Sequence, residues 1–311
     1  MFALREIAVS LTFFVLLYCL LSALVAIAWR SLKLFHAPEK LLADLFFALR
    51  ILPLVASIVL TLAFVVPSFQ LLEPRSIDEQ MGAMPLGLGV CALLLIAVGG
   101  WRVITAHTKT SRMVAQWLDG ASPLNADTDA WAATFRTKRE APPIMLVGVR
   151  KPRVLVSEST VALLSPDELR IALRHELAHI RSQDNLKKLL FRFCPFPGMA
   201  QLESAWSRAT ELAADGASVS TLHDAVDLAA ALVKLSRLVS VDVAPFCIVG
   251  FVTGSIGERV ARLLAWNERE SQNARLRPYA ISGVLITLLC VLSTYGPALR
   301  LTHAATEWLV R

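Results

Sequence analysis

Two short motifs in this sequence contain residue types that could carry out chemistry, and the first is HELAH at residues 175–179. Residues four apart lie on one face of an α-helix, so the imidazoles of His175 and His179 can reach one ion, and neutral imidazoles suit Zn²⁺. Glu176 would lie beside that ion rather than on it, which suits a general base acting on water. The alternative is a buried helix in which these three residues are incidental.

The second motif, ELAAD at residues 211–215, supplies carboxylates. Catalytic zinc takes three protein ligands and keeps one position open. Glu211 can be the third ligand, while Asp215 shares its helix face and can accept a hydrogen bond from a ligating imidazole. A solvated acidic face is the alternative, but the three residues between the carboxylates are apolar. Together the motifs predict one zinc ion per chain and a metalloendopeptidase whose catalytic base is Glu176.

Other polar residues are weaker candidates. Arg208 lies one helical turn before the second motif and could pair with a carboxylate. His223 could donate to an oxyanion, although a lone histidine after a helix is more often structural or exposed. Arg259 could be a surface residue or a contact for a substrate. Asp184 and Asn185 follow the first motif and are candidates to cap or orient its helix.

The elements around the motifs can also be predicted. Ser165 and Glu168 form a capping box with Pro166 at the first helical position, so the helix with the first motif begins there. Further predicted elements are strands at 144–147 and 154–156, helices at 202–218, 224–238 and 259–269, a linker at 119–129 and an apolar loop at 239–256.

The rest of the chain is unusually apolar, with 55% hydrophobic residues among 311. Four stretches are long enough to cross a bilayer, at residues 7–29, 45–66, 81–101 and 279–299. The first is too long for a cleaved signal peptide. Arg50 lies near the start of the second span, where its side chain could snorkel to the interface.

The charges flanking the spans predict their orientation. Lys and Arg concentrate in the first and third connections, whereas the second has one arginine against three acidic residues. The positive-inside rule therefore places the third connection in the cytoplasm and both termini outside. Three domains follow: residues 1–106 with three spans, 107–277 as a cytoplasmic peptidase domain, and 278–311 with the fourth span and a short external tail.

Composition excludes several other functions. The net charge of +6 arises from residues that flank the spans, and no nucleic-acid-binding module is recognisable. Five scattered cysteines without a CxxC spacing argue against a disulfide framework and against a cysteine zinc site. The expected partners are therefore the lipid bilayer and a protein substrate in the cytosol.

The motifs also resemble a known family. SPDEL at 165–169, the run HELAHIRSQDNLKKLL at 175–190, Arg208 and ELAAD resemble the integral-membrane zinc metallopeptidases of the bacterial β-lactam sensor-transducer family, which are gluzincins. PSFQLLEP at 67–74, GERVARLL at 257–264 and the order of the spans resemble it too. The resemblance implies the bacterial cytoplasmic membrane as the location. It implies the same roles for the residues of the two motifs. His175, His179 and Glu211 would be zinc ligands, Glu176 the base, and Asp215 the acceptor of a hydrogen bond from a ligating imidazole.

One departure from that family matters. Its best-known members have an extracellular penicillin-binding sensor domain after the last span, whereas this sequence stops at Arg311. We therefore expect no covalent β-lactam binding through such a domain. The signal would then arrive through the spans, the connection at 67–80, a sensor partner or a second copy of the chain.

The expected fold is an α-helical membrane protein of four spans with a cytoplasmic α+β gluzincin-like domain. The expected function is zinc-dependent hydrolysis of peptide bonds in a cytosolic protein during signal transduction, with a transcriptional repressor or the chain itself as candidate substrates. Alternatives are a quality-control or prenyl-protein-type zinc peptidase and a non-enzymatic receptor with a zinc-stabilised domain. A transporter is disfavoured, because the second to fourth spans lack paired carboxylates.

Overall fold

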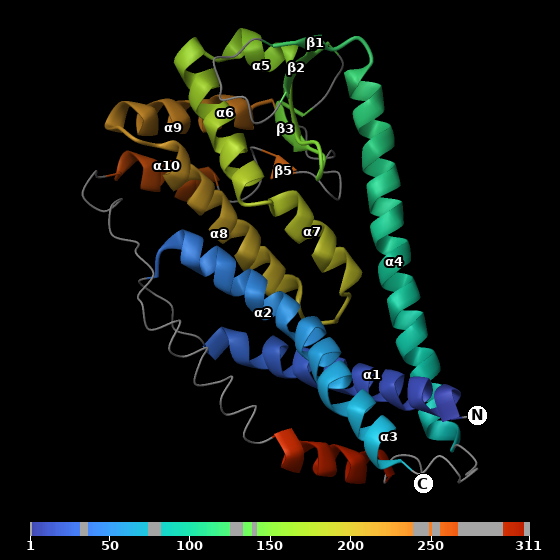
Figure 1. The fold of residues 1–311 in the computed structure, drawn as a ribbon. Helices are drawn as coiled ribbons and strands as arrows, with labels where there is room; N and C mark the ends of the chain where they lie inside the picture. The colour runs from blue at the N-terminus through green and yellow to red at the C-terminus, as the bar shows by residue number, and fades with distance from the viewer. Residues whose placement is uncertain are drawn as a thin grey trace.

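A computed structural model of the chain describes residues 2–31, 37–73, 82–124, 133–138, 142–238, 249–250, 256–266 and 295–307. Long apolar helices fill one end of the molecule, and a smaller domain of helices and one mixed sheet fills the other (Figure 1). The helix α4 (Ala83–Leu118) extends along both parts. The molecule thus combines a helical bundle with a mixed α and β domain, as the sequence predicted.

Among the described residues, three helical segments are long and apolar enough to cross a membrane, namely Phe2–Ser31, Glu39–Leu72 and Ala83–Leu118. The first comprises α1 (Phe2–Ala28) and a 3₁₀ turn; the second comprises α2 (Glu39–Leu60), a π-helical turn and α3 (Val66–Leu72). Many of their large apolar side chains are exposed, as lipid-facing residues would be. The first three predicted spans thus lie on such helices, whereas most of the fourth, 279–299, lies outside the described residues.

A helix over residues 295–307 packs beside the bend between α2 and α3. Pro67 in α3 has no N–H to donate to the carbonyl of Ala63, four residues earlier. The Tyr295 hydroxyl donates a hydrogen bond to that carbonyl at 2.9 Å, and its ring lies 5.3 Å from that of Phe64. A proline in the second segment therefore creates a docking point for the C-terminal helix.

The sheet has five strands in the order β1-β2-β4-β3-β5. Only β2 and β4 pair in parallel; the other pairs are antiparallel. β3 and β4 confirm the two predicted strands, whereas β1, β2 and β5 were not predicted, and β5 falls within the stretch 239–256 that was expected to be a loop. The strands are β1 (Ser122–Pro123), β2 (Ala133–Thr137), β3 (Ile144–Val147), β4 (Arg153–Ser157) and β5 (Val249–Gly250).

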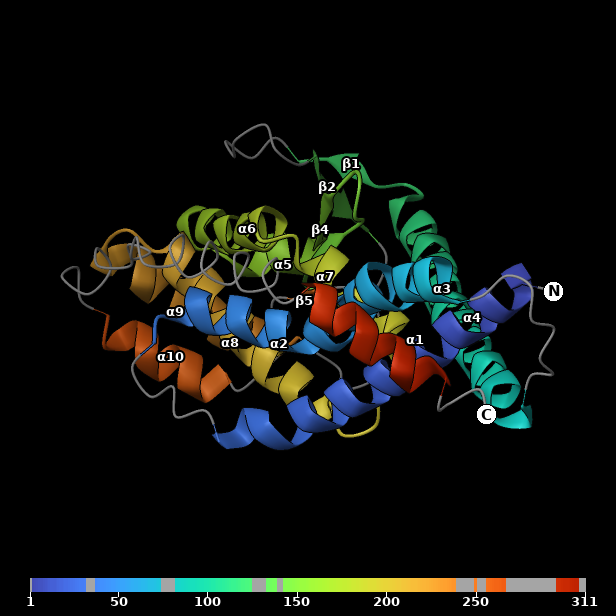
Figure 2. The same cartoon turned by 60° about the horizontal axis from the view of Figure 1, so that its bottom comes forward.

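The two faces of the sheet pack against different helices because side chains alternate along a strand. Ile144 and Leu146 face the core formed with α6 (Pro166–Arg181) and α9 (Leu222–Ser236). Met145 and Val147 face Trp117 near the end of α4. Both ribbon views place α4 on the opposite side of the sheet from α9 (Figures 1 and 2). The boundary expected between residues 106 and 107 falls inside continuous α4 and stays a prediction.

The remaining helices complete the domain. The predicted capping box of α6 is present, with the Glu168 N–H bonded to Ser165 Oγ and the Glu168 carboxylate bonded to the Ser165 N–H. The helices predicted at 202–218 and 224–238 correspond to α8 and α9, which begin two residues earlier than expected. α8 comprises Ala200–Ser218. The other helices of the domain are α5 (Glu158–Leu163), α7 (Asp184–Phe193) and α10 (Ile256–Leu264).

Candidate metal centre

The buried face of α6 brings the residues of the first motif together. His175 and His179 are one helical turn apart, and their Nε2 atoms lie 3.2 Å from each other. Both side chains and that of Glu176 are at most 1% exposed. The spacing of the motif thus places two imidazoles side by side in the interior, as expected for i and i+4 on one helix.

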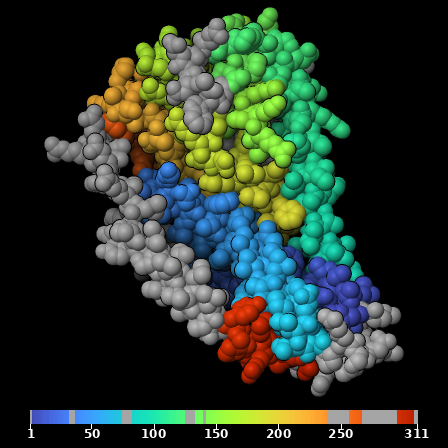
Figure 3. Space-filling view, in the orientation of Figure 1, coloured from blue at the N-terminus to red at the C-terminus, as the bar shows by residue number. Residues whose placement is uncertain are grey.

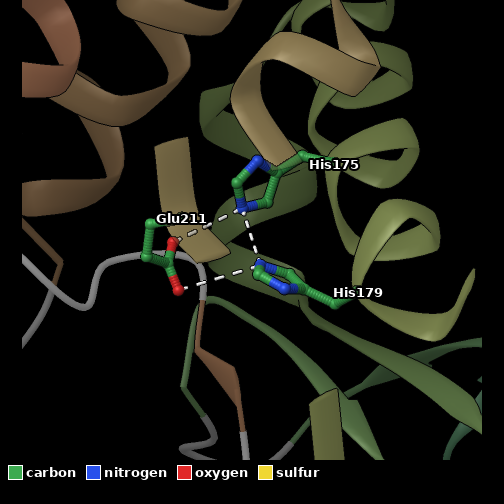
Figure 4. A group of neighbouring side chains, drawn as sticks. All are labelled: His175, His179 and Glu211. Atoms are coloured by element: carbon green, nitrogen blue, oxygen red, sulfur yellow. Dashed lines mark hydrogen bonds and ion pairs between the residues drawn. The ribbon is translucent and has the colours of Figure 1, made fainter. Parts of the chain in front are cut away.

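Helix α8 completes the cluster with Glu211. One carboxylate oxygen lies 3.6 Å from His175 Nε2, and the other lies 3.7 Å from His179 Nε2. The three side chains point toward one another from two helices (Figure 4), and their ligand atoms all lie within 4.8 Å. Ligands about 2.0–2.1 Å from a tetrahedral zinc ion are about 3.3 Å apart. The arrangement therefore fits a metal ion of this size.

Each imidazole holds a second acidic partner through its other ring nitrogen. His175 Nδ1 lies 2.9 Å from an Asp215 carboxylate oxygen, and His179 Nδ1 lies 2.7 Å from one of Asp184. A carboxylate on Nδ1 fixes the proton there and leaves Nε2 free to bind a metal. The left-handed backbone of Gln183 (φ 55°) turns the chain between α6 and α7 just before Asp184.

Arg259, from α10, contacts both carboxylates of the second motif. Its guanidinium is bidentate to Asp215, at 2.7 and 2.6 Å, and lies 2.9 Å from a Glu211 oxygen. Burial alone would raise the pKa of Asp215, but hydrogen bonds with His175 and Arg259 outweigh burial and lower the pKa to about 2. Arg259 therefore neutralises charge and holds the two acidic residues in place.

The charges in the cluster also shift the pKa of its other members. Burial by itself lowers the pKa of His175, but hydrogen bonds to Asp215 and Glu211 raise it to about 9. Burial raises the pKa of Glu176. Among the described residues, neither carboxylate oxygen of Glu176 has a hydrogen-bond partner. A buried carboxylate without partners is costly, so its presence beside three ligand atoms indicates a site for water or a metal.

The structure places the weaker candidates Arg208, His223 and Arg259 in different surroundings. Only Arg259 joins the cluster. Arg208 is 64% exposed and pairs with Glu258, and His223 is 75% exposed and lies 3.4 Å from Asp227. Within the described part of the chain, neither contacts the cluster.

Asp184 and Asn185, which begin α7, have different contacts. Asp184 contacts His179 Nδ1, whereas the sequence suggested only that it caps or orients the helix of the motif. The Asn185 amide donates to the carbonyls of Leu146 and Gly148, at 3.3 and 3.0 Å, and so ties the end of β3 to α7. Their position shortly after the helix of the motif was the signal by which the sequence indicated them.

Comparison with known proteins found a match to a peptidase family. The family model described as BlaR1 peptidase M56 matches residues 132–263, a stretch that includes both motifs and Arg259. No curated protein matches the chain. The family match, the three apolar helices and the cluster of two histidines and a glutamate agree with one another. The match over residues 132–263 supports a BlaR1-like membrane metallopeptidase family for this part of the chain.

Proposed function

We propose that this protein is a membrane-embedded, zinc-dependent endopeptidase that hydrolyses peptide bonds in a cytosolic protein. The observation that carries the proposal is the buried cluster of His175, His179 and Glu211 beside Glu176, whose carboxylate has no partner in the described structure. A zinc site with a purely structural role has no need of such a carboxylate. The family match supports a peptidase.

The three ligands and Glu176 would have separate roles. His175, His179 and Glu211 would hold one zinc ion, which supplies Lewis acidity that lowers the pKa of water and polarises a carbonyl. Glu176 would take a proton from the attacking water and deliver it to the leaving amine nitrogen. Burial raises the pKa of Glu176, which shifts it toward the range in which a general base works best.

The outer residues would set the properties of the ligands. Asp215 and Asp184 would keep each imidazole in the tautomer that offers Nε2. Arg259 would hold Asp215 and one oxygen of Glu211, so that two acidic residues can lie in a buried site without repelling each other. We assign Arg208 and His223 no role in the reaction, because both side chains are largely exposed and have partners elsewhere.

The membrane location would define the substrate. In the bacterial cytoplasmic membrane, the Lys and Arg residues of the third connection would place the peptidase domain in the cytoplasm. A soluble protein such as a transcriptional repressor, or the chain itself, could then reach the site and be cleaved in response to a signal. A reporter fused after Arg112 should read cytoplasmic and one fused after Arg311 external; the opposite result at Arg112 would refute this orientation.

The decisive variant is Glu176→Gln, which removes the base but keeps the shape of the side chain. We expect it to retain zinc and to lose cleavage by about 10²–10⁴-fold. Cytosolic proteins and fragments of the chain itself would be compared by mass spectrometry between wild type and variant under several envelope stresses. Glu158→Gln is the matched control, because Glu158 is 49% exposed and pairs with Arg136 outside the cluster.

The outcomes separate the alternative functions. Fragments that need Glu176 and appear only under stress would support a signalling peptidase. Cleavage of many misfolded proteins in every condition would instead favour a quality-control peptidase. Identical fragments in wild type and Glu176→Gln, together with full zinc binding, would refute the peptidase and leave a zinc-stabilised receptor.

A further inference from the structure

Helix α7 connects the metal cluster with the bundle of membrane helices. Its first residue, Asp184, holds His179 Nδ1 at 2.7 Å, and both side chains are buried. The helix ends nine residues later, at Phe193, about 13.5 Å away at 1.5 Å per residue. The helix therefore spans the distance between a candidate zinc ligand and the membrane helices.

The end of α7 is held by three membrane helices. The last carbonyls of a helix lack partners within it. Here, Arg50 of α2 donates to the carbonyls of Phe191, at 3.5 Å, and Cys194. The Tyr18 hydroxyl of α1 donates to the carbonyl of Pro195 at 3.2 Å. On α4, Gly99 lies so close that a Cβ atom there would overlap the carbonyl oxygen of Phe193.

Arg50 has a second connection to the cluster, through α8. Its guanidinium lies 2.8 Å from Glu203, in the first turn of the helix that carries Glu211 and Asp215. The same guanidinium lies 5.4 Å from the centre of the Phe191 ring. α2 (blue) lies directly against the yellow helices of the domain (Figure 3). One side chain of a membrane helix thus contacts two helices, α7 and α8, that each supply side chains to the metal cluster.

The burial of Arg50 shows that it does not simply reach water. Snorkelling would leave the guanidinium at the interface, whereas here the side chain is 2% exposed. A buried charge in a membrane segment is costly and usually has a function. A cation at a helix C-terminus is also favourable, because the carbonyl end carries partial negative charge.

We propose that Arg50 is a positioning residue through which α2 sets the geometry of the metal ligands. A shift of α2 would move the ends of α7 and α8 together, and with them Asp184, Glu211 and Asp215. This inference rests on the proposed zinc peptidase and names how its membrane helices would regulate it. A signal that displaces α2 would then change zinc affinity and catalytic geometry without a soluble messenger.

A general loss of stability is the rival explanation, and the chain offers a matched control. Arg5 of α1 pairs with Glu73 at 3.1 Å, and the two side chains are 8% and 14% exposed. This pair lies near the end of α3, at the far side of the bundle from α7 (Figure 1). Arg5→Gln and Arg50→Gln therefore both remove a buried cation from a membrane helix, but only Arg50→Gln frees the ends of α7 and α8.

The experiment uses the full chain in lipid nanodiscs and measures zinc affinity by competition with a chromophoric chelator, together with thermal unfolding. We expect Arg50→Gln to weaken zinc binding about tenfold, at the lower end of the range for residues behind metal ligands. Arg5→Gln should change zinc affinity less than twofold while it lowers the unfolding temperature. Arg50→Lys should recover part of the affinity, because an ammonium keeps the charge but not the fork of donors.

A second variant keeps the proposal testable if Arg50→Gln fails to fold. Gly99→Ala changes no charge but pushes the end of α7 away from α4, so we expect a several-fold loss of zinc affinity. Wild-type zinc affinity in Arg50→Gln would overturn the proposal, and so would equal losses of zinc affinity in Arg50→Gln and Arg5→Gln. If Arg50→Gln does not fold, wild-type zinc affinity in Gly99→Ala would overturn it. These readouts need no cleavage, so a protein that binds zinc but cleaves nothing would refute only the peptidase.

Discussion

The membrane bundle exposes large apolar side chains, whereas the peptidase domain buries a cluster of charged and polar ones. On the three apolar helical segments, large apolar residues such as Ile27, Leu62 and Leu93 are more than half exposed. On α6 and α8, by contrast, His175, Glu176 and Glu211 are at most 2% exposed. Exposed apolar helices are stable in lipid, whereas buried charges are stable only with close partners or a metal. The two regions thus indicate two different environments: a bilayer around the apolar helices and a metal ion within the buried cluster.

The largest expected effect comes from removing a ligand. His175→Ala or Glu211→Ala should reduce zinc from about one ion per chain to nearly none, because two remaining ligands do not hold a catalytic zinc. Elemental analysis of the purified protein measures the stoichiometry. His223→Ala removes an exposed histidine and should keep the zinc. Full zinc in Glu211→Ala would show that the third ligand is a different residue.

A charge on the apolar surface tests the other half of the comparison. Leu93 on α4 is 54% exposed, and Leu93→Asp should cost about 2.5–3.5 kcal/mol of membrane insertion. Val226 on α9 is 46% exposed, yet Val226→Asp should cost less than about 0.5 kcal/mol, because its surroundings are aqueous. The amount of protein in the membrane fraction measures both. Equal losses would show that the two surfaces face the same solvent.

The carboxylates behind the histidines should have a smaller effect than the ligands. Asp184→Asn and Asp215→Asn should each weaken zinc binding by about 10–100-fold, because an amide fixes the tautomer of an imidazole less firmly. Chelator competition measures the change. Asp167→Asn serves as control, because Asp167 is 57% exposed and pairs with Arg170. Unchanged zinc affinity in Asp184→Asn would show that α7 does not contribute to zinc binding.

The smallest expected effect concerns the start of α6. Burial raises the pKa of Glu168, but hydrogen bonds from Lys234 and the Ser165 N–H outweigh burial and lower it. A carboxyl whose pKa is lower in the folded state stabilises the protein at neutral pH, and this contribution is lost as the pH falls below its ordinary value of 4.5.

Glu168→Gln should therefore lower the free energy of unfolding by about 1 kcal/mol at pH 7, the typical contribution of a helix cap. The difference from wild type should shrink toward zero in acid. Thermal unfolding of both proteins at pH 7 and at pH 4 measures the two differences. A difference that stays constant with pH would show that the ion pair with Lys234 contributes nothing.

Features that depend on neighbours in the sequence could be predicted. The two motifs, the capping box of α6, two of the strands and the first three apolar helices all follow from spacing within a few turns or from runs of apolar residues. The short strands β1 and β5 could not be predicted, because two residues carry no periodic pattern. β2 depends on its parallel partner β4, which is distant in sequence.

Contacts between residues that are far apart in the sequence could be identified only from the tertiary structure. Arg208, His223 and Arg259 were all weak candidates by residue type, and the packing of α10 brings Arg259 to Asp215 and Glu211. Arg50 suggested an interfacial side chain, yet the contact of α2 with α7 and α8 buries it. The sequence by itself determined which residues could bind zinc, because helical spacing is local. The structure decided which distant charges surround them, because that depends on how the helices pack.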